Sequence, residues 1–235
     1  MRFFNRHFLI LLLSSFFWQR PATAEELDDQ VFFTIEETTC LSPGETRRLA
    51  SDFNLDEFPP AEPNECEAPY WTLLSSLSSL TRLATGDVKA PSQWLAKLPS
   101  HVAQTIASIT TNESPDLSPA EFDFEKNELN LNPSFFRLGP VARLAFLIHA
   151  SRHFEDGHYL HVICPRGPVK GIRACDERYT PTGGGANAAT VYGLSGIYLD
   201  ANTERVNPVT QAYARHLANA ILTLGFSAQP DELLK

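Results

Sequence analysis

The chain has 235 residues, 43% of them hydrophobic, and its formal net charge is −9 because 28 Asp and Glu outnumber 19 Lys and Arg. This length and apolar content allow a domain with a substantial core. An acidic chain without basic clusters is a poor candidate for binding nucleic acid or anionic lipid, so we expect no nucleic-acid partner, and the sequence identifies no other partner.

The first 24 residues have the pattern of a secretory signal peptide. Arg2 and Arg6 give a positive start, an apolar run follows from Phe8 to Trp18, and small residues end the segment at Ala24. The apolar run has about eleven residues, fewer than the roughly 20 that a spanning helix needs. We therefore predict a secreted or periplasmic protein whose mature chain, residues 25–235, is a single globular domain without a membrane span.

Few regular elements are expected in the first half of the chain. Residues 30–36 are typical of a short strand, and prolines predict a loop over residues 41–69. Regularly spaced leucines predict a helix over residues 70–85, and Pro91 is well placed to begin a second helix that extends to residue 106. Residues 110–132 are polar and are predicted to be irregular.

The second half of the chain carries the strongest helical pattern. A nearly continuous apolar run predicts a buried central helix from residue 139 to about Asp156, ended by Gly157. A strand is expected over residues 158–163, a helix over 187–201, and a last helix from about residue 207. The predicted fold class is mainly α (α+β), a helical domain with a few short strands.

Four cysteines in an exported chain favour two disulfides. Of the three pairings, Cys40–Cys66 with Cys164–Cys175 is the most local, and the second bond would close a turn-rich loop. Zinc held by four thiolates is the alternative, but neither pair has C-x-x-C spacing. We therefore predict the two local disulfides.

Four of the seven histidines lie close together, at His149, His153, His158 and His161. His149 and His153 are four residues apart on the predicted helix, so both imidazoles can reach one ion. In an extended strand His158 and His161 point to opposite faces, so at most one of them should join the pair. Because imidazole is a common zinc ligand, these four residues are the candidate metal ligands and zinc is the candidate cofactor.

Three further residues are candidates for supporting this site: Arg152, Asp156 and Tyr192. Arg152 could orient a carboxylate, and Asp156 lies on the same helix face as the two helical histidines. Asp176 would be brought near the site if Cys164–Cys175 forms.

The same histidines allow an interpretation without metal. His149 and His153 could hydrogen-bond to Glu155, to Asp156, to Tyr192 or to backbone carbonyls. The protein would then be a non-catalytic binding or structural protein of the periplasm or cell surface, with a buried histidine cluster.

The segment I-H-A-S-R-H (residues 148–153) resembles the active-site helix of zincin metallopeptidases, whose motif is H-E-x-x-H. By this resemblance, His149 and His153 take the places of the two helical zinc ligands. The family's general base is the Glu after the first histidine, and Ala150 stands in its place here. Hydrolysis needs a carboxylate that takes the proton from bound water. The resemblance therefore implies a metal site, and a degenerate metallopeptidase or hydrolase.

Two groups of zincins are similar over short stretches. Metzincins carry a glycine and a third histidine after the helix, and Gly157 with His158 resembles that pair out of register. Deuterolysin-like aspzincins carry a later D-x-x-Y-G, which Tyr192-Gly193 resembles, with Ala189 in the place of the aspartate and Asn187 as the nearest polar residue.

Residues 148–198 are also similar to uncharacterised exported bacterial proteins with H-E-x-R-H, H-x-H-V-x-C-P and C-D segments. The corresponding segments here are H-A-S-R-H, H-Y-L-H-V-I-C-P (158–165) and Cys175-Asp176. This likeness implies a shared structure.

Overall fold

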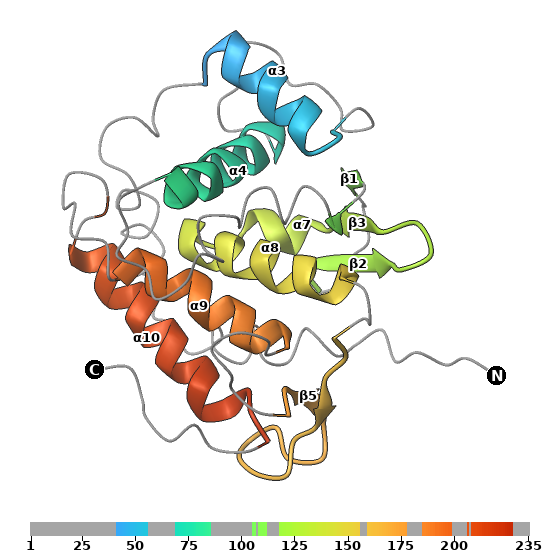
Figure 1. Ribbon diagram of the computed structural model, residues 1–235, viewed down its shortest axis with the longest axis vertical. Helices are drawn as coiled ribbons and strands as arrows, with labels where there is room; N and C mark the ends of the chain where they lie inside the picture. The colour runs from blue at the N-terminus through green and yellow to red at the C-terminus, as the bar shows by residue number, and fades with distance from the viewer. Residues whose placement is uncertain are drawn as a thin grey trace.

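The computed structural model describes residues 41–55, 69–85, 105–106, 108–111, 118–155, 159–177, 185–198, 206 and 208–227. These ranges contain six helices and five short strands (Figure 1), which confirms the mainly α (α+β) class. No helix in them has both the length and the apolar character to cross a bilayer. The predicted signal peptide, the strand over 30–36, Cys40, Cys66 and residues 91–104 of the second predicted helix lie outside the described residues, as do Asp156, Gly157 and His158.

Helix α8 (Pro140–Phe154) is the centre of the fold, with α4 on one side and α9 on the other (Figure 1). Pro140 occupies the first turn, where its missing N–H removes no helical hydrogen bond. Every residue of α8 except Arg143 is buried. The helix ends at Phe154, two residues before the predicted end, because Glu155 already has an extended backbone.

Helix α9 (Ala186–Tyr198) packs between α8 and α10 (Pro208–Leu224). A Cβ atom on Gly193 would lie 2.3 Å from Cδ1 of Ile148, so glycine at this position lets α9 approach α8 closely. Helix α9 begins one residue before its predicted start, and the predicted last helix is confirmed by α10.

Helix α4 (Pro69–Thr85) packs on the other side of α8, and α3 (Pro43–Asp52) packs on α4 (Figure 1). Helix α4 confirms the prediction over residues 70–85. The prediction of a loop over residues 41–69 is wrong for α3, because Pro43 begins a helix and Ser42 Oγ caps it by accepting from the N–H of Glu45 at 3.3 Å.

Three strands and a short helix precede α8, so the prediction of an irregular segment over residues 110–132 is wrong. Strands β1 (Ser108–Thr111) and β2 (Ala120–Asp123) flank β3 (Glu128–Leu131), parallel and antiparallel to it respectively. Helix α7 (Pro133–Phe136) follows directly. Each strand has only four residues, and two of the three show no regular alternation of buried and exposed side chains.

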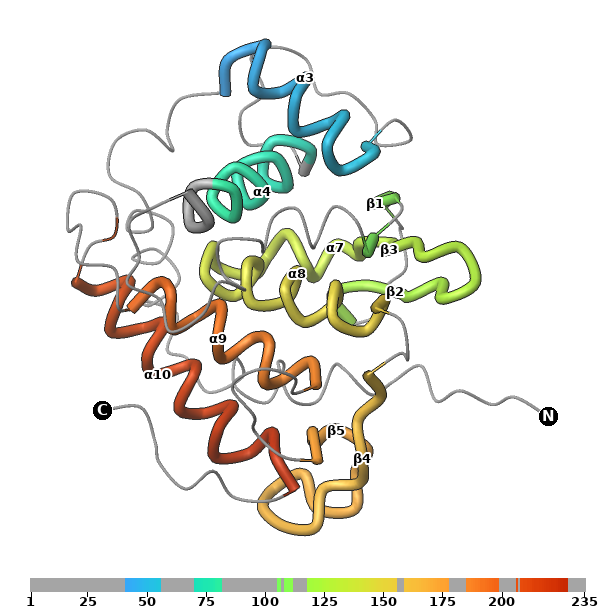
Figure 2. Tube along the Cα trace, viewed as in Figure 1, coloured from blue at the N-terminus to red at the C-terminus, as the bar shows by residue number. Residues whose placement is uncertain are grey.

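The loop between β4 (Val162–Ile163) and β5 (Arg173–Cys175) projects from the helices (Figure 2). The Cys164–Cys175 disulfide closes it, as predicted. Strand β4 covers Val162–Ile163, so it is shorter than the strand predicted over residues 158–163.

Candidate metal centre

Helix α8 brings His149 and His153 together on one face, as their spacing predicts. Their Nε2 atoms lie 3.1 Å apart, and each residue is only 6% exposed. The packing of α8 in the core fixes both side chains, because the helix is buried on nearly all sides between α4 and α9. Two ligand atoms are thus held at one place by the fold itself.

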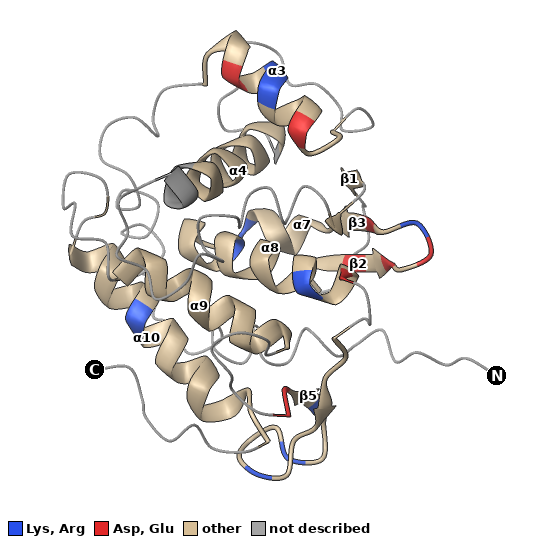
Figure 3. Cartoon of the chain, in the orientation of Figure 1, with Lys and Arg blue, Asp and Glu red and all other residues tan. Residues whose placement is uncertain are grey.

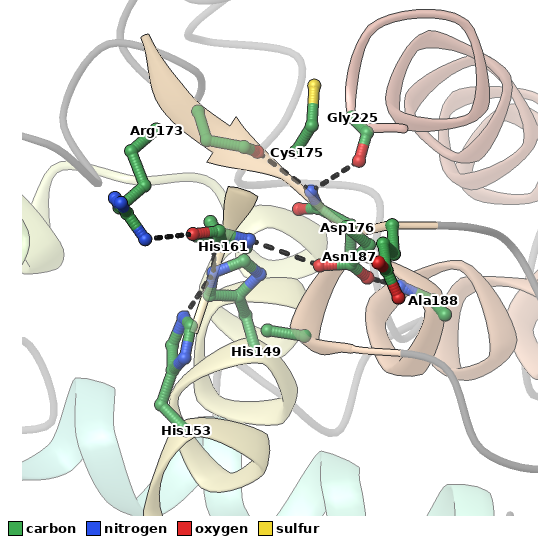
Figure 4. Close-up of polar contacts among 12 residues, drawn as sticks. His149, His153, His161, Arg173, Cys175, Asp176, Asn187, Ala188 and Gly225 are labelled. Carbon is green, nitrogen blue, oxygen red and sulfur yellow. Dashed lines mark hydrogen bonds and ion pairs between the residues drawn. The ribbon is translucent and has the colours of Figure 1, made fainter. Parts of the chain in front are cut away.

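His161, just before β4, completes a group of three (Figure 4). Its Nε2 lies 3.2 Å from Nε2 of His149, and candidate ligand atoms of all three histidines lie within 4.8 Å of one another. His161 therefore joins the helical pair. His158 lies outside the described residues, so the expectation that at most one of the two joins stays a prediction.

The hydrogen bonds on the far sides of two rings determine where their protons sit. The Thr190 hydroxyl donates to the Ala186 carbonyl at 2.8 Å, so its oxygen accepts from Nδ1 of His149 at 3.3 Å. The Asp176 carboxylate accepts from Nδ1 of His161 at 3.1 Å. In the neutral form, each of these two rings then carries its one proton on Nδ1, and the Nε2 lone pairs of His149 and His161 face each other.

A cation between the rings would satisfy these lone pairs. Without a cation, the facing nitrogens of His149, His153 and His161 share at most one proton, the one that His153 can carry on Nε2. Tetrahedral zinc with Zn–N bonds of about 2.0–2.1 Å places its nitrogen ligands roughly 3.3 Å from one another. The Nε2 atom of His149 lies 3.1 Å from that of His153 and 3.2 Å from that of His161, close to this value. The three histidines could therefore hold a metal ion.

Among the described residues, Asp176 is the carboxylate that contacts this cluster. It is 4% exposed, and its Oδ2 accepts from the N–H of Ala188 at 2.9 Å while Oδ1 faces His161. A carboxylate on the outer nitrogen of a histidine ligand fixes the ring and makes its inner nitrogen a stronger ligand.

The start of α9 forms the other wall around Asp176. A Cβ atom on Gly185 would lie 2.5 Å from Oδ1 of Asp176, so a residue without a side chain is needed there. The backbone N–H groups at the start of a helix also favour a negative charge. The glycine-rich entry to α9 thus accommodates the carboxylate that orients His161.

The backbone around Asp176 is fastened to the end of α10 (Figure 4). Its N–H donates to the Gly225 carbonyl at 2.8 Å, and its carbonyl accepts from the N–H of Ser227 at 2.8 Å. The Asn187 amide donates to the Gly225 carbonyl at 2.8 Å and to the Ala174 carbonyl at 3.0 Å. Asn187, the nearest polar residue in the aspzincin-like segment, therefore holds the backbone together.

Burial keeps the helical histidines neutral. Desolvation lowers the pKa of His153 to about 3, with the nearby His161 adding to the effect and a backbone hydrogen bond at Tyr159 opposing it. Desolvation also holds the pKa of His149 well below its ordinary value, with the other two imidazoles contributing. Neutral imidazole is the form that binds metal, so the site is ready to accept a cation.

The helices that form the site carry few charges (Figure 3), and α9 has none. The charge that contacts the three imidazoles within the described part of the chain is that of Asp176. A divalent cation held by neutral histidines would keep a net positive charge there, which favours an anionic or strongly polar ligand at its remaining position.

The other predicted supporting residues have different surroundings. Arg152 forms an ion pair with Glu155 and stacks over the Tyr159 ring at 3.7 Å. Tyr192 is buried on α9, but about 200° around the helix from Thr190, which faces His149. Asp156 lies outside the described residues.

Sequence reasoning missed Thr190 and raised Asp176 only as a residue that the disulfide could bring near. Thr190, like Asn187 and Ser195, is a polar residue in a largely apolar helical pattern, and that contrast is the signal that could have identified it. Asp176 directly follows Cys175, so the disulfide that the cysteine spacing predicts is the signal for its position.

The chain matches none of the protein-family models, curated proteins or solved structures with which it was compared.

Proposed function

We propose that this chain is an exported zinc-binding protein whose site is built on a zincin-like helix and whose peptidase chemistry is degenerate. The observation that carries the proposal is the convergence of three buried Nε2 atoms, two of them with lone pairs turned inward by Thr190 and Asp176. His149, His153 and His161 would hold the ion. Bound zinc would supply a Lewis acid with one remaining position for an outside ligand.

Two features support export. The first 24 residues have the pattern of a secretory signal, and a disulfide joins Cys164 to Cys175. Disulfides persist in oxidising compartments such as the periplasm or the cell exterior.

The described carboxylates near the site support the degenerate assignment, because none of them is free to act as a general base. Ala150, in the place of the zincin glutamate, is completely buried in the core. Asp176 already uses both oxygens, on His161 and on the N–H of Ala188, so its role is to position a ligand. Glu155 pairs with Arg152. These carboxylates are therefore poorly placed to take a proton from bound water.

Elemental analysis of the purified exported protein tests the proposal. We expect about one zinc per chain, lost in His149→Ala and His153→Ala and retained in His216→Ala, a matched control because His216 is exposed on α10. A chelator should also lower the stability of the wild-type protein, because a ligand present at about 100 times its Kd adds roughly 2.7 kcal/mol to the free energy of unfolding. A wild-type protein that neither contains nor takes up zinc would refute the proposal and favour a buried polar cluster.

Hydrolysis of casein, measured with and without chelator, tests the degenerate assignment separately. We expect no chelator-sensitive hydrolysis, because Ala150 cannot act as a base. Zinc-dependent cleavage that His149→Ala abolishes would show that another group replaces the missing glutamate.

A further inference from the structure

The metal centre joins a rigid half to a loop half. His149 and His153 belong to α8, which is buried in the main core. His161 lies just before β4, and Asp176 just after β5, so both stand at the base of the loop that these strands enclose. The position of the third ligand therefore depends on how this loop is held.

The loop has little packing of its own. Its strand pair matches Val162 with Cys175 and Ile163 with Arg173, with an irregularity between the two pairs. So short a ladder is not stable alone. The loop packs around its own small cluster, separate from the main core, whose buried members are Cys164, Val169, Ala174 and Cys175. Two of these four residues are the disulfide itself.

The two ends of the loop are held differently. The Asp176 end is fastened to α9 and to the end of α10 through its own backbone and carboxylate. The His161 end is held to the other strand, where Arg173 donates to the His161 carbonyl at 3.3 Å and the N–H of Cys164 donates to the Ile172 carbonyl at 2.7 Å. The disulfide joins the two ends covalently, three residues after His161 and one residue before Asp176.

We propose that the Cys164–Cys175 disulfide is a redox latch of the metal centre, so that the oxidised protein binds zinc tightly and the reduced protein binds it weakly. This inference rests on the proposed zinc function. Reduction by a dithiol breaks the S–S bond, transfers two electrons and two protons to give two thiols, and closes the dithiol to its own disulfide. The covalent link that keeps His161 beside Asp176 is then lost, while His149 and His153 stay on α8.

The size of the effect follows from the length of the closed loop. The two cysteines are 11 residues apart. In the chain-entropy model, a disulfide across a loop of this length favours the closed loop over the open loop by a factor of about 100. The hydrogen bonds that remain after reduction compensate for part of this factor. We therefore expect zinc affinity to fall by about 10- to 100-fold when the Cys164–Cys175 disulfide is reduced.

Zinc competition against a chromophoric chelator tests the latch in the full chain carrying Cys164→Ser and Cys175→Ser. We expect zinc binding to be about 10- to 100-fold weaker than in the wild type. The helical circular dichroism spectrum should be unchanged, because the helices pack in the main core, which is separate from the cluster of the loop. His161→Ala should reduce affinity strongly in the disulfide-bonded protein and much less in the double-serine protein. Equal zinc affinity with and without the disulfide would overturn the proposal.

A second measurement needs no cysteine variant and remains decisive if the double-serine protein does not fold. Wild-type protein is equilibrated in a dithiol–disulfide buffer with and without zinc, and the oxidised fraction is counted by thiol labelling. Reciprocity requires zinc to favour the disulfide by the same factor by which the disulfide favours zinc. His149→Ala should abolish this shift. A shift toward the dithiol, from zinc captured by free thiols, would overturn the latch.

The two measurements separate this inference from the proposed function. If oxidised wild-type protein binds no zinc, the function and the latch both fail. If both redox states bind zinc equally, the latch alone fails.

Discussion

Replacing Asp176 by asparagine isolates the contribution of its carboxylate to the metal centre. One oxygen of Asp176 accepts from Nδ1 of His161 at 3.1 Å, and the other accepts from the N–H of Ala188 at 2.9 Å. An asparagine amide has one oxygen and one NH2 group. Asp176→Asn can therefore accept from only one of these donors and presents its own donor to the other.

Both orientations of the asparagine damage the site. If its oxygen stays on Ala188, its NH2 group meets Nδ1 of His161, and the imidazole must turn or move its proton to the nitrogen that faces the metal. If its oxygen stays on His161, the Ala188 N–H is left buried without an acceptor, at a cost of about 1–3 kcal/mol. Loss of such an outer partner of a histidine ligand weakens metal binding by about 10- to 100-fold.

Zinc competition and urea denaturation measure the two effects of Asp176→Asn. Glu177→Gln is the matched control, because it removes the same charge from the next residue, whose side chain is exposed. We expect Glu177→Gln to behave as the wild type. A zinc affinity of Asp176→Asn equal to that of this control would refute the role assigned to the carboxylate.

Three other predictions follow from burial and close packing. Acidification should destabilise the zinc-free protein, because the pKa of His153 is about 3 in the fold against an ordinary 6.5. Between these values the unfolded state binds more protons, so the free energy of unfolding should fall by up to about 1.4 kcal/mol per pH unit, and urea titrations should show a flatter slope for His153→Ala. Gly185→Ala places a Cβ 2.5 Å from an oxygen of Asp176 and should weaken zinc binding, measured by competition. Gly193→Ala places a Cβ 2.3 Å from Ile148 and should cost about 1–3 kcal/mol, partly restored by Ile148→Val in a double-mutant cycle. A free energy of unfolding that does not change with pH would contradict the first prediction. An unchanged zinc affinity in Gly185→Ala would contradict the second, and strictly additive effects of Gly193→Ala and Ile148→Val would contradict the third.

The elements that the sequence predicts well are those whose pattern is local. Helix α8 has a nearly continuous apolar run, and α4 and α10 have apolar residues at helical spacing, so their existence can be predicted from the sequence pattern. Helix α3 was missed because Pro43-Gly44 was interpreted as a break, whereas proline also begins helices. Strands β1, β2 and β3 were missed because their stability comes from pairing with one another.

In the candidate metal centre too, local relationships can be predicted from the sequence and contacts between distant segments cannot. The spacing of His149 and His153 predicts one face of a helix, and the alternation of a strand predicts that His158 and His161 cannot both join them. The cysteine spacing predicts the disulfide that brings Asp176 near the site, but no local pattern predicts its pairing with the distant segment around Phe226. Asp156 was preferred as the supporting carboxylate because helical proximity can be inferred from sequence.

The pairing of Asp176 with Gly225 and Ser227 sets an order of events in the maturation of the chain. Synthesis begins at the amino terminus, so the three imidazoles are made well before the residues that hold the Asp176 backbone in place. A nascent chain stalled before Gly225 would carry the ligands without this support. If the site holds zinc as proposed, a chain cut before Gly225 should bind the ion more weakly than the full chain, because the carboxylate that orients His161 loses its backbone anchor.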